Sequence, residues 1–431
     1  MRPGSHPAGG VDVPAPFHIL RFKFNIMGYP WHHGDMPTSS ISTARRWSML
    51  VIALTATTCA NVFINGAAFL IPTLHRDRGL DLGLAGLLSA MPSFGMVLTL
   101  IAWGWLVDRV GERIVLTVGS ALTATFAFGA ASVQSLWAVG AFLLLGGMAA
   151  ASSNAASGRV VVGWFPPEQR GLAMGIRQTA TPLGVGLGAL VIPRVAESHG
   201  VGTALLFPAV VCVLSAVICA IGVLDPPRLP RAEAPAEHLA NPYRGSSVLA
   251  RIHAVSVLLV IPQGFVWTFM LVWLMTERGW SAASAGALVT ASQVLGAAGR
   301  IGAGRWSDVL GLRLRPIRYI AAAAAVTMAL LAVTDALGSP VSVALIVIAS
   351  VVTVSDNGLA FTAIAEIAGP FWSGRALGTQ NTTQHLATAI GSPLFGALIA
   401  VAGFPVAFAV CALCPLAAFP LVPNDADAVA K

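Results

Sequence analysis

About twelve apolar stretches, each long enough to cross a lipid bilayer, follow residue 47 of this chain. A spanning helix needs roughly 20 predominantly apolar residues, and a chain of 431 residues with only 10% charged residues cannot cover a soluble fold. The stretches begin near Ser48, Gly83, Val115, Leu136, Gly171, Gly202, Ile252, Ser281, Ile317, Pro340, Ala376 and Phe404. They predict an all-α polytopic membrane protein with twelve transmembrane helices, several of them rich in the small residues that favour close packing.

A Pro-rich and charged segment divides these spans six and six. It reads DPPRLPRAEAPAEHLANPYRGSSVLA over residues 225–250, a composition typical of an exposed linker. We therefore expect a six-helix bundle over 48–224, a linker over 225–250, a second six-helix bundle over 251–424 and a tail over 425–431. Residues 1–47 are expected to be a disordered tail, in which 1–35 are alternatively an upstream mis-start before Met36.

A charged phrase occurs twice in the chain, at an offset of 200 residues. GWLVDRVGER (104–113) follows span two, and GRWSDVLGLR (304–313) follows span eight. A further match, at an offset of 203, relates Gly175 and Gln178 of RGLAMGIRQT (170–179) to Gly378 and Asn381 of GRALGTQNTT (374–383), at the starts of spans five and eleven. A duplicated six-span unit with pseudo-symmetric halves is typical of transporters that bind their substrate between the halves.

The chemistry of the repeated phrase suits a latch at helix ends on the cytoplasmic side. Its first glycine lacks a Cβ, so one helix end can approach a neighbour closely. Its aspartate stands at a helix junction, where a carboxylate can accept backbone N–H groups and face a positive helix end. Its last arginine can clamp a carboxylate or the carbonyl groups that end a helix. The alternative is a simple mark of topology, a charged cytoplasmic turn without a gating role.

The G-x-x-x-D-x-x-x-G-x-R phrase between spans two and three resembles the signature loop of the major facilitator superfamily, and a weaker copy follows span eight. The resemblance covers about residues 45–424. It implies two six-helix bundles that rock about a central site, and a gating role for the repeated residues. Those residues are Gly104, Asp108, Arg109, Gly111, Arg113, Gly304, Asp308, Gly311 and Arg313. The second copy departs from the pattern because Val309 stands where the first has Arg109.

Charged residues interrupt several apolar spans, and such residues usually line a water-filled path. They are Arg159, Arg177, Arg300, Asp356 and Glu366. At 1.5 Å per residue, Arg159 on span four and Arg177 on span five lie at similar depths, roughly 9–10 Å from the cytoplasmic end. Two guanidinium groups at one level can clamp a carboxylate or a phosphate. Alternatively, one or both pair with Glu366 or with backbone carbonyls and hold helices together.

Further polar residues near the middle of the spans complete the predicted site. Substrate contact is predicted for Arg159, Arg177, Asn154, Gln178, Gln263, Asn357 and Gln384. Asn154 and Arg159 are about 140° apart around their helix, so both cannot point at one ligand. Proton coupling is predicted for Asp356 and His385, roughly 15–18 Å deep, because burial disfavours a charged carboxylate and histidine titrates near neutrality. The alternatives are a fixed salt bridge from Asp356 to Arg300 and a hydrogen-bonding role for His385.

The three buried arginines outnumber the two buried carboxylates, which favours a negatively charged substrate. We therefore expect a proton-coupled secondary transporter, a symporter of a small organic anion. The alternative is a drug–proton antiporter, although span four lacks the arginine that such proteins place there. An enzyme is not expected, because the spans contain no HExxH motif and no Ser–His–Asp grouping. Cys411 and Cys414 have no histidine nearby, so no metal and no cofactor are expected.

The arginines and lysines of the loops are distributed unevenly between the two sides of the membrane. Counted from an inside N-terminus, most of them lie in even-numbered loops, and the odd-numbered loops contain only Arg76, Arg78, Arg194 and Arg278. The positive-inside rule therefore predicts cytoplasmic termini in a multi-pass protein of the cell (inner or plasma) membrane. The net charge of +7 does not indicate nucleic acid. The expected partners are a small-molecule substrate, protons and membrane lipids, and the expected working unit is a monomer.

Overall fold

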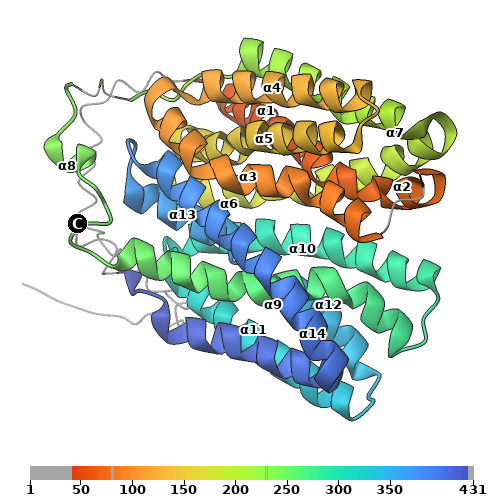
Figure 1. The fold of residues 1–431 in the computed structure, drawn as a ribbon. Helices are drawn as coiled ribbons and strands as arrows, with labels where there is room; N and C mark the ends of the chain where they lie inside the picture. Colours follow the sequence, from red (N-terminus) through yellow and green to blue (C-terminus); the bar gives the residue numbers. More distant parts are fainter. Residues whose placement is uncertain (1–40, 79–81, 229, 231, 426–431) are drawn as a thin grey trace, which may run out of the picture. The chain divides into compact units, whose positions relative to one another are not determined.

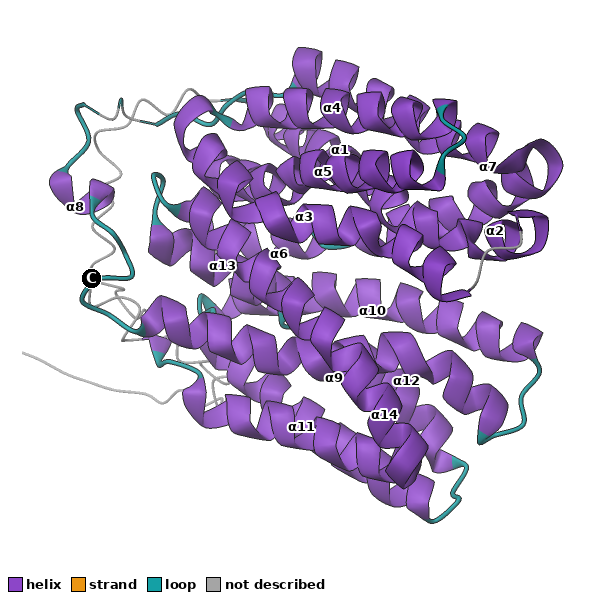
Figure 2. Cartoon of the chain, in the orientation of Figure 1, coloured by secondary structure: helices purple, strands orange, loops and turns teal. Residues whose placement is uncertain are grey.

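The computed structural model describes residues 41–78, 82–228, 230 and 232–425, and these residues form helices with no strand among them (Figures 1 and 2). We call the part of the chain before the linker the N half and the part after it the C half. The N half contains α1 (Thr43–Gly66), the 3-10 helix η1 (Ala67–Leu70), α2 (Ile71–Arg78), α3 (Leu82–Val110), α4 (Glu112–Ser132), α5 (Leu136–Trp164), α6 (Pro167–Arg177) and α7 (Ala180–Gly222). The short helix α8 (Ala236–Leu239) lies in the linker. The C half contains α9 (Val248–Thr276), α10 (Ala282–Leu310), α11 (Leu314–Ala336), α12 (Val341–Val352), α13 (Asn357–Ala368) and α14 (Ser373–Leu421). Most of the expected N-terminal tail and the last six residues lie outside the described ranges.

Twelve spans can be followed through these helices. Ten helical segments of the described residues are long and apolar enough to cross a membrane. Two of them, Pro167–Gly222 with 56 residues and Ser373–Leu421 with 49, are long enough to cross it twice. In each of these two, a pair of helices meets across a kink at a glycine with a positive φ, Gly200 at 81° and Gly403 at 78°. Each of the two segments therefore supplies two of the predicted spans.

Spans five and ten are also interrupted partway along their length, which the hydropathy of the sequence did not predict. In span five, α6 ends at Arg177 and α7 begins at Ala180. In span ten, α12 ends at Val352 and α13 begins at Asn357. At the break in span ten, a tighter turn replaces the regular helical hydrogen bonds, and the N–H of Asn357 donates to the carbonyl of Val354 at 3.4 Å. Each interruption places polar residues at the end of a short helix.

Glycines let the helices of one half approach closely, as the sequence predicts. A Cβ on Gly95 of α3 would lie 2.0 Å from the carbonyl oxygen of Leu144 on α5, and one on Gly147 of α5 would lie 1.9 Å from that of Pro92. Such contact distances exclude any larger residue without a shift of the backbone. Large apolar side chains such as Trp137 remain exposed, as expected of a surface that faces lipid instead of water.

Candidate functional site

The first copy of the repeated phrase ends α3 and holds the N-terminus of α14, which belongs to the other half. Oδ1 of Asp108 accepts the N–H of Gly374 at 2.8 Å, and Oδ2 accepts the N–H of Arg375 at 3.1 Å. Nε of Arg375 also donates to Oδ2 at 3.0 Å. A Cβ on Gly104 would lie 2.3 Å from the carbonyl oxygen of Gly374. We call these four residues the first latch, in which a carboxylate satisfies the free N–H groups at a positive helix end.

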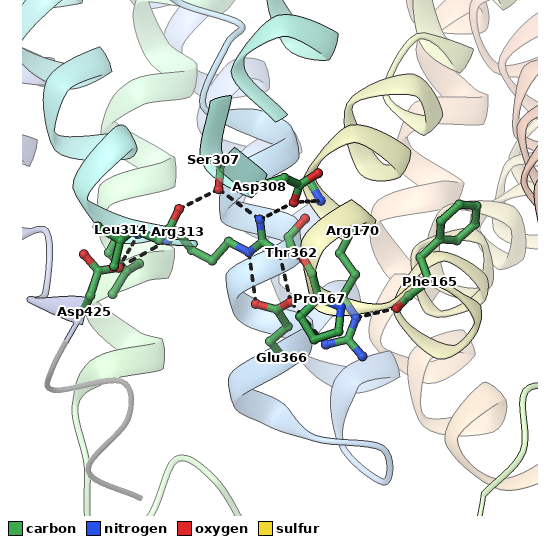
Figure 3. Close-up of polar contacts among 12 residues, drawn as sticks. Phe165, Pro167, Arg170, Ser307, Asp308, Arg313, Leu314, Thr362, Glu366 and Asp425 are labelled. Atoms are coloured by element: carbon green, nitrogen blue, oxygen red, sulfur yellow. Dashed lines mark hydrogen bonds and ion pairs between the residues drawn. The ribbon is translucent and has the colours of Figure 1, made fainter. Parts of the chain in front are cut away.

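The second copy makes a similar contact with the halves exchanged, because here the C half provides the aspartate and the N half provides the helix (Figure 3). Oδ1 of Asp308, on α10, accepts the N–H of Gly171 at 2.9 Å, and Oδ2 accepts the N–H of Leu172 at 2.8 Å, both in the middle of α6. A Cβ on Gly304 would lie 2.1 Å from the carbonyl oxygen of Gly171. Nη1 of Arg313 donates to Asp308 at 2.7 Å. We call these five residues the second latch. The two latches together connect helices of the two halves through hydrogen bonds from backbone N–H groups to Asp108 and Asp308, the contacts that the sequence led us to expect. The gating role of the repeated phrase stays a prediction.

Glu366 of α13 adds an ion pair between the halves beside the second latch (Figure 3). Its carboxylate accepts from Nη1 of Arg170 on α6 and from Nε of Arg313, each at 3.2 Å. Burial lowers the pKa of Arg313, but the carboxylates of Glu366 and Asp308 outweigh burial and raise this pKa above its usual value. The guanidinium group of Arg313 therefore stays charged in the closed latch.

Arg159 is part of the first latch network. Its buried side chain forms an ion pair with Asp108, and its Nε donates to Glu112 at 2.7 Å. Removing one partner of a buried ion pair typically costs about 3–5 kcal/mol, so this pairing holds α3, α4 and α5 together. Arg159 and Arg177 share no hydrogen-bond partner among the described residues, and the pairing of Arg159 with two carboxylates is in line with the alternative that this arginine holds helices together.

The remaining predicted gating residues lie around the latches. Gly111 and Gly311, with φ of 99° and 64°, occupy turns that favour glycine. Arg109 is exposed, and its guanidinium carbon lies 3.8 Å from the ring centroid of Trp105. The structure therefore places Arg109 outside the hydrogen bonds of the first latch. Nε of Arg113 donates to the carbonyl of Ala220 at 2.9 Å, near the end of α7, which is one of the two roles expected for this arginine.

Two aspartates outside the repeated phrase fasten the loops that contain it. Oδ1 of Asp225 accepts the N–H of Arg113 at 2.8 Å, and Oδ1 of Asp425 accepts the N–H of Arg313 at 3.2 Å and that of Leu314 at 2.9 Å. Each aspartate follows the last span of its own half. The two are 200 residues apart, the offset of the repeated phrase, and this offset is the signal by which the sequence could have revealed them.

Arg177 ends α6 with its side chain only 3% exposed, and its hydrogen-bond partners are all neutral. Nε donates to Oγ of Ser157 at 2.9 Å, and Nη2 donates to the backbone oxygen of Asn154 at 3.1 Å and to its side-chain oxygen at 3.4 Å. Nη1 donates to the side chain of Gln178. Two predicted substrate residues, Asn154 and Gln178, thus contact Arg177. Arg159 lies on the same helix as Asn154 but contacts Asp108 and Glu112 instead.

Arg300 and Asp356 occupy adjoining positions of α10 and span ten without forming an ion pair. Their side chains are 3% and 1% exposed, and within the described residues Nε of Arg300 and Oδ1 of Asp356 have no hydrogen-bond partner. A Cβ on the preceding Gly299 would lie 3.1 Å from Oγ of Ser355, which precedes Asp356. The guanidinium carbon of Arg300 lies 5.5 Å from the ring centroid of Trp267. The alternative of a fixed salt bridge between Arg300 and Asp356 is therefore not formed in this structure.

Three predicted amide residues of the C half form one hydrogen-bonded chain. Oε1 of Gln263 on α9 accepts from Nδ2 of Asn357 at 3.0 Å, and Oδ1 of Asn357 accepts from Nε2 of Gln384 on α14 at 3.3 Å. Asn357 directly follows Asp356. His385 directly follows Gln384 and has no hydrogen bond within the described part of the chain.

Helices α6, α10 and α13 of the two halves approach closely near the residues that have these charged groups. A Cβ on Gly175 of α6 would lie 2.5 Å from the carbonyl oxygen of Arg300, and one on Gly358 of α13 would lie 3.3 Å from Cα of Gly175. Arg177, Arg300 and Asp356 each lie within two residues of these contacts. The backbone positions of two arginines and one aspartate thus lie near the junction between the halves, and these three residues together have one more positive charge than negative charges.

Comparisons with known proteins agree with a transporter. The sequence profile of the Major Facilitator Superfamily matches residues 51–392. An uncharacterized MFS-type transporter of Mycobacterium tuberculosis is 60% identical over 378 residues, which are 88% of this chain and 85% of that protein. Weaker similarity links 36% of the chain to 29% of a probable chloroplastic anion transporter of Arabidopsis thaliana, at 31% identity. The 4-hydroxybenzoate transporter PcaK of Pseudomonas putida is 26% identical over 34% of each chain.

Solved structures share the same fold at low sequence identity. The proton:xylose symporter XylE, bound to 6-bromo-6-deoxy-D-glucose, has a TM-score of 0.73 at 17% identity, over 89% of this chain and 97% of that chain. The human organic anion transporter MFSD10 has a TM-score of 0.70 at 17% identity, over 88% and 99%. At this level of identity, the likeness concerns the fold alone.

Proposed function

The chain belongs to the major facilitator superfamily, whose members are membrane transporters and not enzymes, and on this premise we propose that it moves a small organic anion by alternating access. In this proposal the latches, whose hydrogen bonds join the halves, close the cytoplasmic side, so the substrate would enter the central site from the opposite side in this state. The charges of that site support an anion as the substrate.

The observation that carries this proposal is a difference between buried arginines. Arg159 forms ion pairs with two carboxylates, whereas Arg177 and Arg300 form no ion pair among the described residues, although Asp356 lies near enough to Arg300 to act on its charge. A buried charge without a partner is costly, and a guanidinium group matches the geometry of a carboxylate. An anion bound between Arg177 of the N half and Arg300 of the C half would supply the missing charge. The anion and 4-hydroxybenzoate transporters among the similar proteins support the same substrate class.

The second part of the proposal is coupling to protons through Asp356. When ionised, Asp356 offsets one of the two positive charges of the site. When protonated, it leaves both guanidinium groups available to the anion. Proton binding and anion binding therefore favour one another by the same factor, as linkage requires. The unpartnered Oδ1 of Asp356 supports this role, and His385, which adjoins the amide chain, is the other candidate for the proton.

Binding and uptake measurements test this function directly. We expect the purified protein to bind carboxylates, with 4-hydroxybenzoate and hexuronates as probes, more tightly as the pH falls through the range in which Asp356 takes up its proton. Proteoliposomes with an acidic outside should accumulate the bound probe. Asp356→Asn should bind tightly at every pH and accumulate nothing against a gradient. Binding of neutral sugars or cationic drugs in place of carboxylates would reject the anion proposal and favour drug–proton antiport.

We further propose that both termini and the linker are cytoplasmic, in the plasma membrane, and that the protein works as a monomer, as is typical of the superfamily. The excess of arginine in the even-numbered loops supports this orientation. A single cysteine in place of Ala234 of the linker, in a cysteine-free version, should react with a membrane-impermeant maleimide only after lysis. Labelling in intact cells would reverse the orientation.

A further inference from the structure

Two tryptophans donate hydrogen bonds to backbone carbonyls of the linker region. Nε1 of Trp164, at the end of α5, donates to Leu224 at 3.0 Å, and Nε1 of Trp372, before α14, donates to Leu239 at 3.1 Å. Within the described residues, only the second indole touches a latch residue, since the guanidinium carbon of Arg375 lies 3.5 Å from the ring centroid of Trp372. The two tryptophans thus share a contact with the linker but differ in their contact with the latch.

From these contacts we infer that the linker braces the first latch through Trp372, which is a positioning residue for Arg375. The carbonyl of Leu239 fixes the indole, and the face of the indole fixes the plane of the guanidinium group. Nη2 of Arg375 donates to the carbonyl of Phe371 at 2.7 Å, which leaves Nε directed at Asp108 at 3.0 Å. A preoriented arginine loses less conformational freedom when the latch closes, so the closed state is favoured.

The linker segment after Leu239 is itself held on the C half. The hydroxyl of Tyr243 lies 2.9 Å from Nε2 of His253 on α9, and the two rings stack with centroids 5.9 Å apart. Nδ1 of His253 lies 2.7 Å from Oε1 of Gln380 on α14. Only three residues lie between Leu239 and Tyr243, so the docking of Tyr243 limits the movement of the carbonyl that holds Trp372.

The brace belongs to one latch only. At the offset of 203 residues that relates spans five and eleven, the residues equivalent to Trp372 and Arg375 are Gln169 and Leu172. Among the described residues, the second latch therefore has neither the indole nor an arginine of the other half bound to its aspartate. Asp308 forms its ion pair with Arg313 of its own half. The linker therefore braces the first latch, whereas no linker residue in the described ranges braces the second in this way.

Matched tryptophan variants test the brace in the full-length protein without substrate. The reporter is Leu377→Cys in a cysteine-free version, because the buried side chain of Leu377 lies against Gly158 across the two halves and becomes reachable when the cytoplasmic side opens. Trp372→Phe keeps the ring and loses the donor, so labelling from the cytoplasmic side should rise about 2-fold to 10-fold. Trp372→Leu also loses the ring and should raise labelling roughly 10-fold or more. Trp164→Phe loses a comparable bond, to the carbonyl of Leu224 just before the linker, and should leave labelling unchanged.

The inference also requires that Trp372 act through the latch. In an Asp108→Asn background, Trp372→Leu should add less than about 2-fold, since the contact that it prepares is already lost. A full additional effect in that background, or equal labelling of the two Phe variants, would overturn the brace. Melting curves recorded on Trp372→Phe separate a loosened latch from a loss of folding. Because no substrate is used, these outcomes are independent of the anion proposal.

Discussion

Gly304→Val is expected to reduce transport about 100-fold and to leave the protein with an open cytoplasmic side. A Cβ at this position would lie 2.1 Å from the carbonyl oxygen of Gly171 and 2.6 Å from its carbonyl carbon. Both atoms belong to the backbone of α6, so they cannot move aside as a flexible side chain would. Forcing extra atoms into a close contact typically costs about 1–3 kcal/mol, and a backbone clash belongs at the upper end of this range. A cost of about 3 kcal/mol changes an equilibrium roughly 100-fold.

Gly302→Val is the matched control for this experiment. Gly302 lies two residues earlier on the same helix, and nothing comes within 4 Å of a Cβ placed there. The two variants share the same change in helix propensity, so their difference isolates the close approach of α10 and α6. Uptake in proteoliposomes and labelling of Leu377→Cys report transport and opening. Near-normal transport by both variants would mean that the second latch does not need this contact.

Arg177→Lys and Arg300→Lys are each expected to weaken binding of a carboxylate probe roughly 30-fold to several thousand-fold. Lysine keeps the charge but loses the planar fork that bonds a carboxylate at two points. Truncating a desolvated charged contact typically costs about 2–5 kcal/mol, which gives this range of affinity. Equilibrium binding to the purified variants measures the loss, and a melting curve without ligand shows whether each variant is folded.

Arg159→Lys separates this site from the clamp that the sequence predicts. Arg159 is bound to Asp108 and Glu112, so its replacement should lower the melting temperature and favour opening, while probe affinity stays within a few-fold. The opposite pattern, with affinity lost in Arg159→Lys and retained in Arg300→Lys, would restore the clamp of Arg159 with Arg177. Unchanged affinity in all three variants would argue against an anionic substrate.

The features that could be predicted from the sequence are those that depend on local composition or on the repeat. Span length is set by the thickness of the bilayer, so the twelve spans could be read from hydropathy. The phrase around Asp108 and Asp308 contains the glycine and the carboxylate that a latch contact needs, and both aspartates accept backbone N–H groups from a helix of the other half. The repeat does not predict which helix each aspartate contacts, because that depends on how the two halves pack.

The arrangement of the central site could not be predicted in the same way. Depth along a helix placed Arg159 and Arg177 at one level, but depth does not fix which neighbour a side chain meets. The angle of about 140° between Asn154 and Arg159 was the better guide, since Asn154 meets Arg177 while Arg159 turns to Asp108. The breaks in spans five and ten gave no signal in hydropathy, because the polar residues there occupy only a turn in an otherwise apolar segment.

The reciprocal latches make the junction between the halves self-complementary. Each half offers one carboxylate to the other and receives one at the equivalent helix, the pattern of an isologous contact between the subunits of a two-fold dimer. Two identical six-span chains could form both contacts at once with a single set of residues. The linker then joins two partners that already have contacts for one another, and its bond to Trp372 adds to one of these contacts. The two latches differ in the source of the cation, which is Arg375 across the junction in the first and Arg313 of the same half in the second.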